Sequence, residues 1–482
     1  MNPYTTGVPV MELKAVARII TYPRKREGAP QVPLQPQKLA ETPPEAAGTD
    51  TAPGDFFDRL AEDGILREHL VNERKRLLAE VTVLRTENRW EDIVTLLHPV
   101  EEKCPELDDA CMASPLRYEV SFALDHLGRF DEAIALARAC VESEPENFHY
   151  HAGLAYTAYN SLYAAKTRRV TLHPAERKAR IELAHRHFDK ACTLRPGGVT
   201  SFYRRGMLFK QIQNKKDKAL PLFETAVRNW DALEAEEREK RHQERKNFVK
   251  SLYQLASCLL DAGKPLEALE KLQRCIEEDS ASQYLRMVHK HFALAKTYFH
   301  LGRLEPALDA LRCAAALADP EDDDYVFELM ARVHLFSKDT HRAWEAVNRV
   351  PPRKRRPYFR WTEADVLLAR GETDRAVRIL EEAAEKDRRG RHKALMRLVR
   401  IDFRRGNFEV CLKWARDARS FFWEQYQNTY AEALLWEAAA LVRLKNLQEA
   451  ARVAEELAAT HPGHPHLGRL RQALAEAQSQ SS

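Results

Sequence analysis

The chain has 482 residues, enough for two to four ordinary globular domains. Hydrophobic residues make up 44% of it and charged residues 31%, which indicates a soluble, folded, helix-rich protein. The 76 basic and 72 acidic residues leave a net charge of +4, which argues against a general nucleic-acid coat but leaves room for local basic patches.

The cysteines and the lengths of the apolar runs indicate the cellular compartment of the protein. None of the eight cysteines forms a CxxC pair, so the spacing predicts neither a zinc site nor a redox pair. Four of them fall on the apolar stripe of a predicted helix, where Cys serves as a small core residue: Cys140, Cys258, Cys275 and Cys411. Residues 1–21 lack the features of a secretory signal, and no apolar run is long enough to span a bilayer. We therefore expect a cytoplasmic protein.

Residues 1–54 form a segment of different composition. Seven prolines lie between positions 23 and 53, so the segment cannot hold a helix or bury enough apolar surface to offset its ordering entropy. We predict a disordered tail. Within it, residues 11–22 (MELKAVARIITY) form a short apolar and basic stretch. This stretch is either a plain leader or a docking peptide that becomes ordered on a partner, on a second copy of the chain, or on the chain's own groove.

From about residue 55 the apolar pattern is helical and repeats. A small or apolar residue opens the second helix of each repeat at ten positions: Ile93, Ala133, Ala184, Ala219, Ala268, Ala307, Ala343, Ala376, Cys411 and Ala450. The shortest intervals lie near 34 residues, as expected for a two-helix unit. Short turns precede these positions, and five glycines are placed to take the left-handed conformation at a helix end: Gly128, Gly263, Gly302, Gly371 and Gly406.

These patterns resemble the tetratricopeptide repeat family over roughly residues 70–476. The family pattern is clearest in two copies, each with a Leu-Ala pair, a turn glycine and a small opening residue: Leu255-Ala256, Leu259, Gly263, Ala268 and Leu272, and Leu294-Ala295, Tyr298, Gly302, Ala307 and Leu311. The resemblance implies an all-α fold, a right-handed α-solenoid of about ten helix-turn-helix repeats over residues 55–462. Residues 463–482 are expected to supply a capping helix and a short tail. Two departures are Lys338 in place of a turn glycine and Pro351-Pro352, which cuts one second helix short.

Two insertions interrupt the repeat spacing. The first, at residues 164–180, is predicted to be a basic loop followed by a helix extension. The second, at residues 230–248, is acidic first and basic later, so a single extended helix with i,i+4 ion pairs explains it. The alternative for the second insertion is a projecting arm that contacts a partner.

The sequence shows no catalytic constellation. It contains no glycine-rich phosphate loop and no GxSxG or HExxH motif. Its i,i+2 histidine pairs diverge by about 200° on a helix and make poor metal chelators. We expect no enzyme activity, no cofactor and no metal.

The remaining candidate for function is the surface. The resemblance implies that the first helices line a concave face, where members of the family commonly bind extended peptides or partner helices. Placing the sequence on the family pattern puts ten aromatic and four basic side chains on that face: Tyr118, Phe122, Tyr156, Tyr159, Tyr203, Tyr253, Phe292, Phe299, Trp361 and Phe403, with Lys296, Arg332, Arg400 and Arg404. Rigid rings and guanidinium groups suit a protein-binding surface. Each ring could equally pack between neighbouring first helices.

The densest charge cluster lies between prolines in residues 348–361. Arg353, Lys354, Arg355 and Arg356 are expected in an extended, exposed turn. In one interpretation they contact phosphates, with Tyr358 and Trp361 available for stacking, and Arg388, Arg389 and Arg391 add to the basic surface. In the other they form a solvated loop. The sequence thus predicts a non-enzymatic interaction scaffold or adaptor, with nucleic-acid binding as the alternative.

Overall fold

The computed structural model describes residues 53–107 and 110–480, and every regular element in these two ranges is a helix. The tail up to residue 52, with its predicted docking peptide at residues 11–22, lies outside the described residues. The chain divides into two compact units. The first extends to Lys264 and includes Glu277–Tyr284, and the second consists of Pro265–Ile276 and the chain from Leu285 onward.

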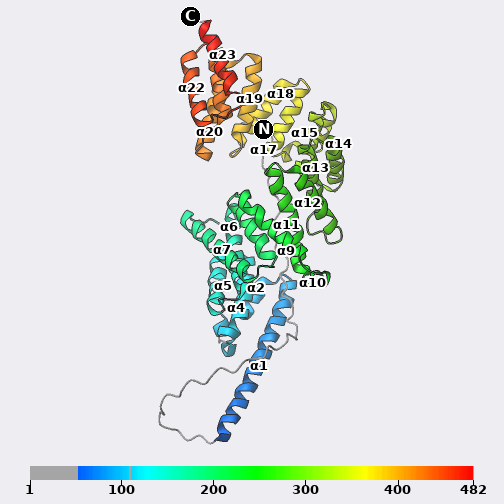
Figure 1. Ribbon diagram of the computed structural model, residues 1–482, viewed down its shortest axis with the longest axis vertical. Helices are drawn as coiled ribbons and strands as arrows, with labels where there is room; N and C mark the ends of the chain where they lie inside the picture. Colours follow the sequence, from blue (N-terminus) through cyan, green and yellow to red (C-terminus); the bar gives the residue numbers. More distant parts are fainter. Residues whose placement is uncertain (1–52, 108–109, 481–482) are drawn as a thin grey trace. The chain divides into compact units, whose positions relative to one another are not determined.

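The first unit is built from helix pairs (Figure 1). Its first helices are α1 (Pro53–Thr86), α4 (Ala110–Leu127), α6 (Phe148–Lys166), α8 (Thr200–Met207) and α11 (His242–Asp261). Its second helices are α2 (Trp90–Leu97), α5 (Phe130–Ser143), α7 (Pro174–Leu194) and α9 (Lys216–Asp231). Shorter pieces are α3 (Val100–Lys103), α10 (Ala235–Lys240), a 3-10 turn (Pro105–Leu107) and a π-helical turn (Leu208–Ile212).

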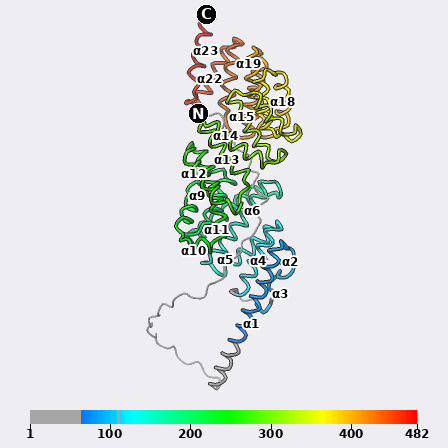
Figure 2. Tube along the Cα trace, turned by 90° about the vertical axis from the view of Figure 1, so that its right-hand side faces the viewer, coloured from blue at the N-terminus to red at the C-terminus, as the bar shows by residue number. Residues whose placement is uncertain are grey.

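The second unit continues the same plan, and its pairs from α13 to α22 follow one another in chain order (Figure 2). It opens with α12 (Pro265–Glu278), most of which belongs to this unit. First helices are α13 (Met287–His300), α15 (Asp324–Phe336), α17 (Pro357–Ala369), α19 (Arg391–Arg405) and α21 (Ala431–Arg443). Second helices are α14 (Leu304–Leu317), α16 (Thr340–Asn348), α18 (Thr373–Lys386), α20 (Phe408–Tyr426) and α22 (Leu447–Thr460). A 3-10 turn (Pro352–Lys354) precedes α17, and α23 (Leu467–Ser479) packs on α21 and α22 at the predicted position of a capping helix.

The ten predicted opening residues mark where the helices of a pair come closest. Each is at most 1% exposed, and nine of them are the fourth residue of their helix, as Ala307 is in α14. The exception is Ala184, the eleventh residue of α7, because α7 carries a two-turn extension at its start. A side chain larger than those present would separate the helices there, which explains the recurrence of Ala and Cys.

The predicted turn glycines are confirmed. All five have positive φ angles, between 70° and 82°, a conformation that glycine adopts without steric cost. The residue predicted to replace a turn glycine, Lys338, has a φ of 62°, so the chain makes the same turn there with a side chain present. The local geometry of the turns therefore follows the repeat even where the residue type departs from it.

The two insertions have different structures. In the first, α6 ends at Lys166 and α7 begins at Pro174, and the buried Arg180 of the α7 extension binds Asp131 of α5 at 2.5 Å. In the second, the single extended helix expected over residues 230–248 is wrong. The segment is divided into α9, the short α10 and α11, because Glu234 is extended, at ψ 157°, and Arg241, at φ −102° and ψ 34°, leaves the helical conformation. The expected i,i+4 ion pairs are present, but only around α10, as in Arg241–Glu237 at 2.9 Å.

Cysteine occupies core positions, as predicted. The four residues on the apolar stripes are all buried, and the seven cysteines whose side chains the structure describes are free thiols. Within those same ranges, no helix is both long enough and apolar enough to cross a membrane.

Candidate functional site

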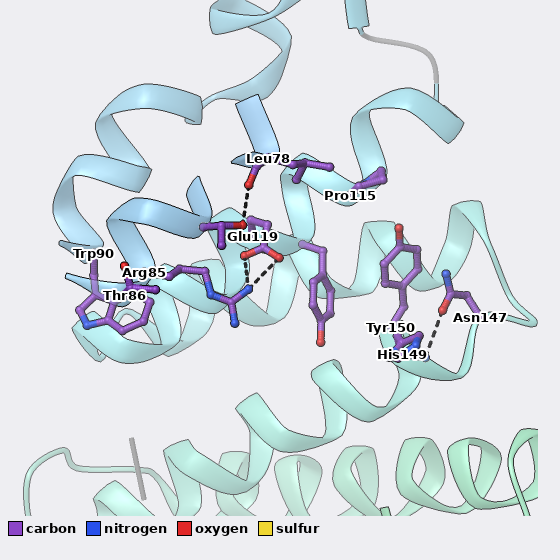
Figure 3. A pocket seen from close by; sticks show the side chains of 11 residues that line it. Leu78, Arg85, Thr86, Trp90, Pro115, Glu119, Asn147, His149 and Tyr150 are labelled. Carbon is purple, nitrogen blue, oxygen red and sulfur yellow. Dashed lines mark hydrogen bonds and ion pairs between the residues drawn. The ribbon is translucent and has the colours of Figure 1, made fainter. Parts of the chain in front are cut away.

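A pocket lies where the first helices of the first unit meet. We call the surface carried by α1, α4, α6, α8 and α11 the first-helix face of this unit; α1 contacts α4, and α4 contacts α6. The pocket has a volume of about 360 Å³ (Figure 3). Its lining residues come from four helices and the turn before α6: Leu78, Thr82, Arg85, Thr86, Trp90, Pro115, Tyr118, Glu119, Asn147, His149 and Tyr150.

A nearly buried ion pair forms one wall of the pocket. The guanidinium of Arg85 donates to both carboxylate oxygens of Glu119, at 3.0 and 2.9 Å, and the two side chains are only 11% and 8% exposed. Burial raises the pKa of Glu119, and the charge of Arg85 opposes this rise. Arg85 also lies 4.7 Å from the ring centre of Phe122. The pocket therefore contains two charges that already neutralise each other.

The opposite wall is aromatic and depends on a glycine. The rings of Tyr118 and Tyr150 lie 5.3 Å apart. A Cβ atom at Gly153 would come within 2.4 Å of the Tyr118 ring, so only glycine lets α6 approach α4 this closely. The start of α6 is fixed by Asn147, whose side-chain oxygen accepts the N–H of His149 at 3.0 Å. These contacts hold the wall in one arrangement without a ligand.

Next to the pocket, the first-helix face carries a buried carboxylate. Asp125 accepts a hydrogen bond from the Asn160 amide at 2.6 Å, and its Oδ1 has no hydrogen-bond partner among the described residues. Burial raises the pKa of Asp125 to about 7, against the opposing effects of Asn160 and Arg204. The guanidinium of Arg204 lies 3.6 Å from the ring centre of Tyr156. Polar groups from α4, α6 and α8 are thus joined across three repeats.

The predicted aromatic residues of the first unit divide into two groups. Tyr118, Tyr159 and Tyr203 are each less than 10% exposed, so they pack mainly between helices. Phe122, Tyr156 and Tyr253 are half-buried and reach the surface. Only Tyr118 of these six lines the pocket.

In the second unit, the predicted rings are again split between core and surface. Phe292 and Trp361 are buried, whereas Phe299 and Phe403 are half-buried. Trp361 has cations near its ring, with Lys393 at 5.2 Å and Arg397 at 5.7 Å from the ring centre.

The predicted basic residues of the second unit mostly stabilise the stack. Arg332 lies 3.7 Å from Glu328 and 5.6 Å from the ring centre of Phe299. Arg400 binds Glu432 of the next first helix at 2.8 Å. A charge reversal at either arginine would set two carboxylates against each other, so its effect on binding could not be separated from its effect on folding.

Lys296 and Arg404 complete the predicted set. Lys296 is half-buried and engaged in contacts of its own. Arg404 is exposed and belongs to no ion pair within the described residues. It is therefore the predicted basic residue of this face whose charge is not used by a neighbouring repeat.

The predicted basic loop is not an exposed, extended turn throughout. Arg353 and Lys354 both face Glu321, at 3.7 and 2.8 Å. Arg355 is only 5% exposed and binds Glu363 at 2.5 Å, and Arg356 lies 3.3 Å from the buried Asp324.

The two rings expected to stack on bases are engaged as well. The Tyr358 hydroxyl donates to Asp324 at 2.5 Å, and Trp361 is buried. Because all four cations have carboxylate neighbours, the loop has little charge left for phosphate.

Sequence reasoning missed most of the pocket. Arg85, Trp90, Glu119 and His149 were not among its candidates. The sequence did contain one signal for the pocket, the first opening residue, Ile93. A second helix that begins near Ile93 requires a first helix immediately before it, and this helix brings residues 78–86 onto the same face as Tyr118.

Histidines pair between helices and form no metal site. The Nδ1 atoms of His151 and His187, from α6 and α7, lie 2.8 Å apart, and burial lowers the pKa of His187 to about 4. Among the described residues, no group of three or more His, Cys, Asp and Glu side chains is arranged to hold a metal ion.

Comparisons with known proteins identify the repeats. Residues 115–147 and 250–282 each match the family described as tetratricopeptide repeat. No curated protein matches the sequence. Among solved structures, the chain is similar to yeast Tom70, with 13% identity, 85% of this chain and 89% of that chain covered, and a TM-score of 0.41.

Two further solved structures are similar. The first is a chain in the complex of Naa15/Naa10 bound to HypK-THB, with 17% identity, coverage of 84% and 70%, and a TM-score of 0.40. The second is PilF of Pseudomonas aeruginosa, with 14% identity, coverage of 50% and 90%, and a TM-score of 0.37. The likeness is one of helical-repeat folds.

The ion pair in the pocket predicts a large stability effect. Replacing Arg85→Ala leaves Glu119 buried without its partner, so we expect the free energy of unfolding at pH 7 to fall by about 3–5 kcal/mol. Arg129→Ala, which removes an exposed pair with Glu132, serves as the control and should cost much less. Urea unfolding followed by circular dichroism measures both. Equal losses would contradict the assigned role of the buried pair.

The raised pKa of Asp125 predicts a pH dependence. The folded chain holds this proton more tightly than the unfolded chain between about pH 4 and pH 7, so this group makes stability fall as pH rises through that window. Asp125→Asn removes the effect. We expect the variant to gain stability relative to the parent by up to about 1.4 kcal/mol per pH unit across the window, and nothing further above it. A constant difference from pH 4 to pH 8 in urea unfolding would refute the assignment.

Proposed function

Because this chain is a tetratricopeptide-repeat protein, we propose that it is a non-enzymatic interaction scaffold or adaptor that binds an extended segment of a partner protein on the first-helix face of its first unit. Stacked repeats form long continuous surfaces of the kind that such segments occupy. The observation that supports this site is the pocket of about 360 Å³ between α1, α4 and α6. The pocket is the anchor point of the proposed interface.

The chemistry of the pocket suits a bulky apolar side chain. Leu78, Pro115, Tyr118 and Tyr150 supply apolar walls. The two charged groups of the pocket are paired with each other, so an entering apolar group does not strip water from an unpaired charge. Buried aromatic anchors in pockets of this kind usually supply most of the binding energy of an interface.

The polar groups at the rim contribute less to recognition. The Thr82 hydroxyl donates to the carbonyl of Leu78 at 2.8 Å, and the Thr86 hydroxyl to that of Val83 at 2.7 Å. The Asn147 side chain is engaged at both its oxygen and its nitrogen, since its amide also donates to Glu144 at 3.0 Å. The one side-chain amide in the pocket lining is therefore already engaged in the turn before α6. We infer that the partner is selected by apolar shape rather than by main-chain hydrogen bonds.

The cytoplasm remains the compartment that we propose. The seven cysteines whose side chains the structure describes are free thiols, and five of them are buried as small core residues. Free thiols persist in a reducing compartment. Fractionation of the native cells, with detection of the chain by antibody, tests this assignment.

Filling the pocket tests the proposed site. Thr82 lines the pocket and is exposed, so Thr82→Trp should place a large ring in its mouth without breaking a contact between helices. We expect this variant to lose at least about tenfold in recovery or affinity of the partner, the equivalent of about 1.4 kcal/mol. The measurement is affinity purification from the native source with quantitative mass spectrometry, followed by titration of the partner identified.

The adjacent residue provides the matched control. Val83 lies on the same helix, is 55% exposed and does not line the pocket, so Val83→Trp adds the same ring elsewhere. Circular dichroism should show both variants folded. Partners that bind the Thr82→Trp and Val83→Trp variants equally well would place the interface away from the pocket.

A further inference from the structure

The turn between α18 and α19 in the second unit carries three arginines whose charges are not used within the fold. We call Arg388, Arg389 and Arg391 the cationic turn. All three are exposed, and none has a carboxylate partner among the residues that the structure describes. This sets them apart from the loop at residues 353–356, where every cation faces an acid.

The cationic turn is rigid. Asp387 Oδ1 accepts the N–H groups of Arg389 and Gly390, at 2.9 and 2.8 Å. A Cβ atom at Gly390 would come within 2.6 Å of Asp387 and 2.8 Å of Trp361, so a larger residue would have to displace these two side chains. The arginine side chains are therefore presented from a fixed backbone, and little conformational entropy is lost by the backbone on binding.

The start of α19 adds to the positive potential. The first turn of this helix contains no acidic residue, and its N-cap residue, Gly390, has no side chain with which to cap it, although the Asp387 carboxylate accepts the N–H of Gly390 itself. The helix dipole places partial positive charge at this end. His392, in the same turn, is 5% exposed, and its Nδ1 has no hydrogen-bond partner among the described residues.

Exposed aromatic rings lie beside the cationic turn. The hydroxyl of Tyr426, near the end of α20, donates to the carbonyl of Arg389 at 2.8 Å. Tyr426 is 49% exposed and Trp423 is 53% exposed. Residues three apart on a helix are neighbours, so Trp423 lies next to Tyr426. The ring centre of Phe422 is 4.6 Å from that of Tyr426, so the two rings pack against each other.

We propose that the cationic turn, together with Trp423 and Tyr426, binds an acidic segment of a partner protein that carries a bulky apolar residue beside its carboxylates. Guanidinium groups bind carboxylates through two parallel hydrogen bonds, and Trp, Tyr and Arg are the residues that dominate protein interfaces. The site goes beyond the proposed function, because it lies in the second unit and binds an acidic segment, whereas the pocket of the first unit binds an apolar side chain.

The distribution of charge favours a protein segment over a nucleic acid. A single strand is held by a basic groove that follows its phosphates over several nucleotides. Here the three exposed arginines of the site lie within four residues, 388–391, which is too short a stretch to follow several phosphates. The neighbouring basic loop at residues 353–356 could extend a track, but its charges are largely used within the fold. Arg355 pairs with Glu363 and Arg356 with Asp324, and Arg353 and Lys354 share Glu321.

Labelled peptides test the proposal on the full-length chain. The first probe is a fluorescein-labelled 12-residue peptide rich in Asp and Glu with one central Phe, and the second has Ser in place of Phe. Fluorescence anisotropy should show that the Phe peptide binds more tightly by several fold and that both weaken as salt rises. The combined substitution Arg388→Gln, Arg389→Gln and Arg391→Gln should lower the affinity of both peptides at least tenfold.

Two further variants separate the parts of the surface. In Trp423→Ala, the two peptides should bind equally, because the ring that distinguishes them is gone. Arg353→Gln combined with Lys354→Gln is the charge control and should bind as the parent does. Thr82→Trp should also bind as the parent does, which keeps this test independent of the pocket in the first unit.

Three results would overturn the proposal. The first is no saturable binding of the Phe peptide at millimolar concentration. The second is equal loss of affinity in the Arg353/Lys354 control and in the cationic-turn variant. The third is a 12-nucleotide single strand, used as competitor, that binds at least tenfold more tightly than the Phe peptide and loses this affinity in the cationic-turn variant; it would make the surface a nucleic-acid site instead.

Discussion

The close contact between the two helices of a pair is the constraint on which the rest of the structure depends. It requires a small or well-fitted residue at the fourth position of nearly every second helix, and one pair alone cannot bury its apolar side. Successive first helices are then joined by polar contacts whose sequence separation, 32 to 35 residues, is the repeat length. These contacts are Arg85–Glu119, Asn160–Asp125, Thr362–Glu328, Arg397–Asp365 and Arg400–Glu432. The repeat therefore determines which charged side chains are paired between neighbouring repeats and which remain unpaired.

That distinction separates the two surfaces of functional interest. In the pocket of the first unit, Arg85 and Glu119 neutralise each other, so an apolar group can enter without meeting an unpaired charge. At the start of α19 the opposite holds, because Arg388 and Arg389 in the preceding turn and Arg391, the first residue of the helix, have no carboxylate partner among the described residues. A scaffold with both surfaces could hold two partner segments of different chemistry on two different units.

The fold could be predicted from the sequence because its signals are local. A small residue after a short turn, a glycine with positive φ at the helix end, and apolar residues at helical spacing each act within a few positions, and the structure confirms them even at Lys338. The interruptions at residues 230–248 were missed because i,i+4 ion pairs suit one long helix and the short α10 between α9 and α11 equally well.

The site could be predicted only in part, for a physical reason. Helical periodicity places a residue on the first-helix face, but whether its side chain reaches solvent depends on the residue about 34 positions away. Tyr118 and Trp361 are covered by the neighbouring helices, and Arg355 is held by Glu363 in the core of its loop. The pocket combines α1, α4 and α6, and no single segment contains enough of it to be recognised.

The most direct test of the central claim is site-specific photocrosslinking from the pocket. A benzoylphenylalanine placed at Thr86, which lines the pocket, should crosslink in a native extract to one partner protein, at a segment that contains a bulky apolar residue. The same probe at the exposed Glu80, on another side of α1 and outside the pocket lining, should not capture that segment. Identical crosslinks from the two positions, or none from Thr86 above the level found at Glu80, would contradict the account.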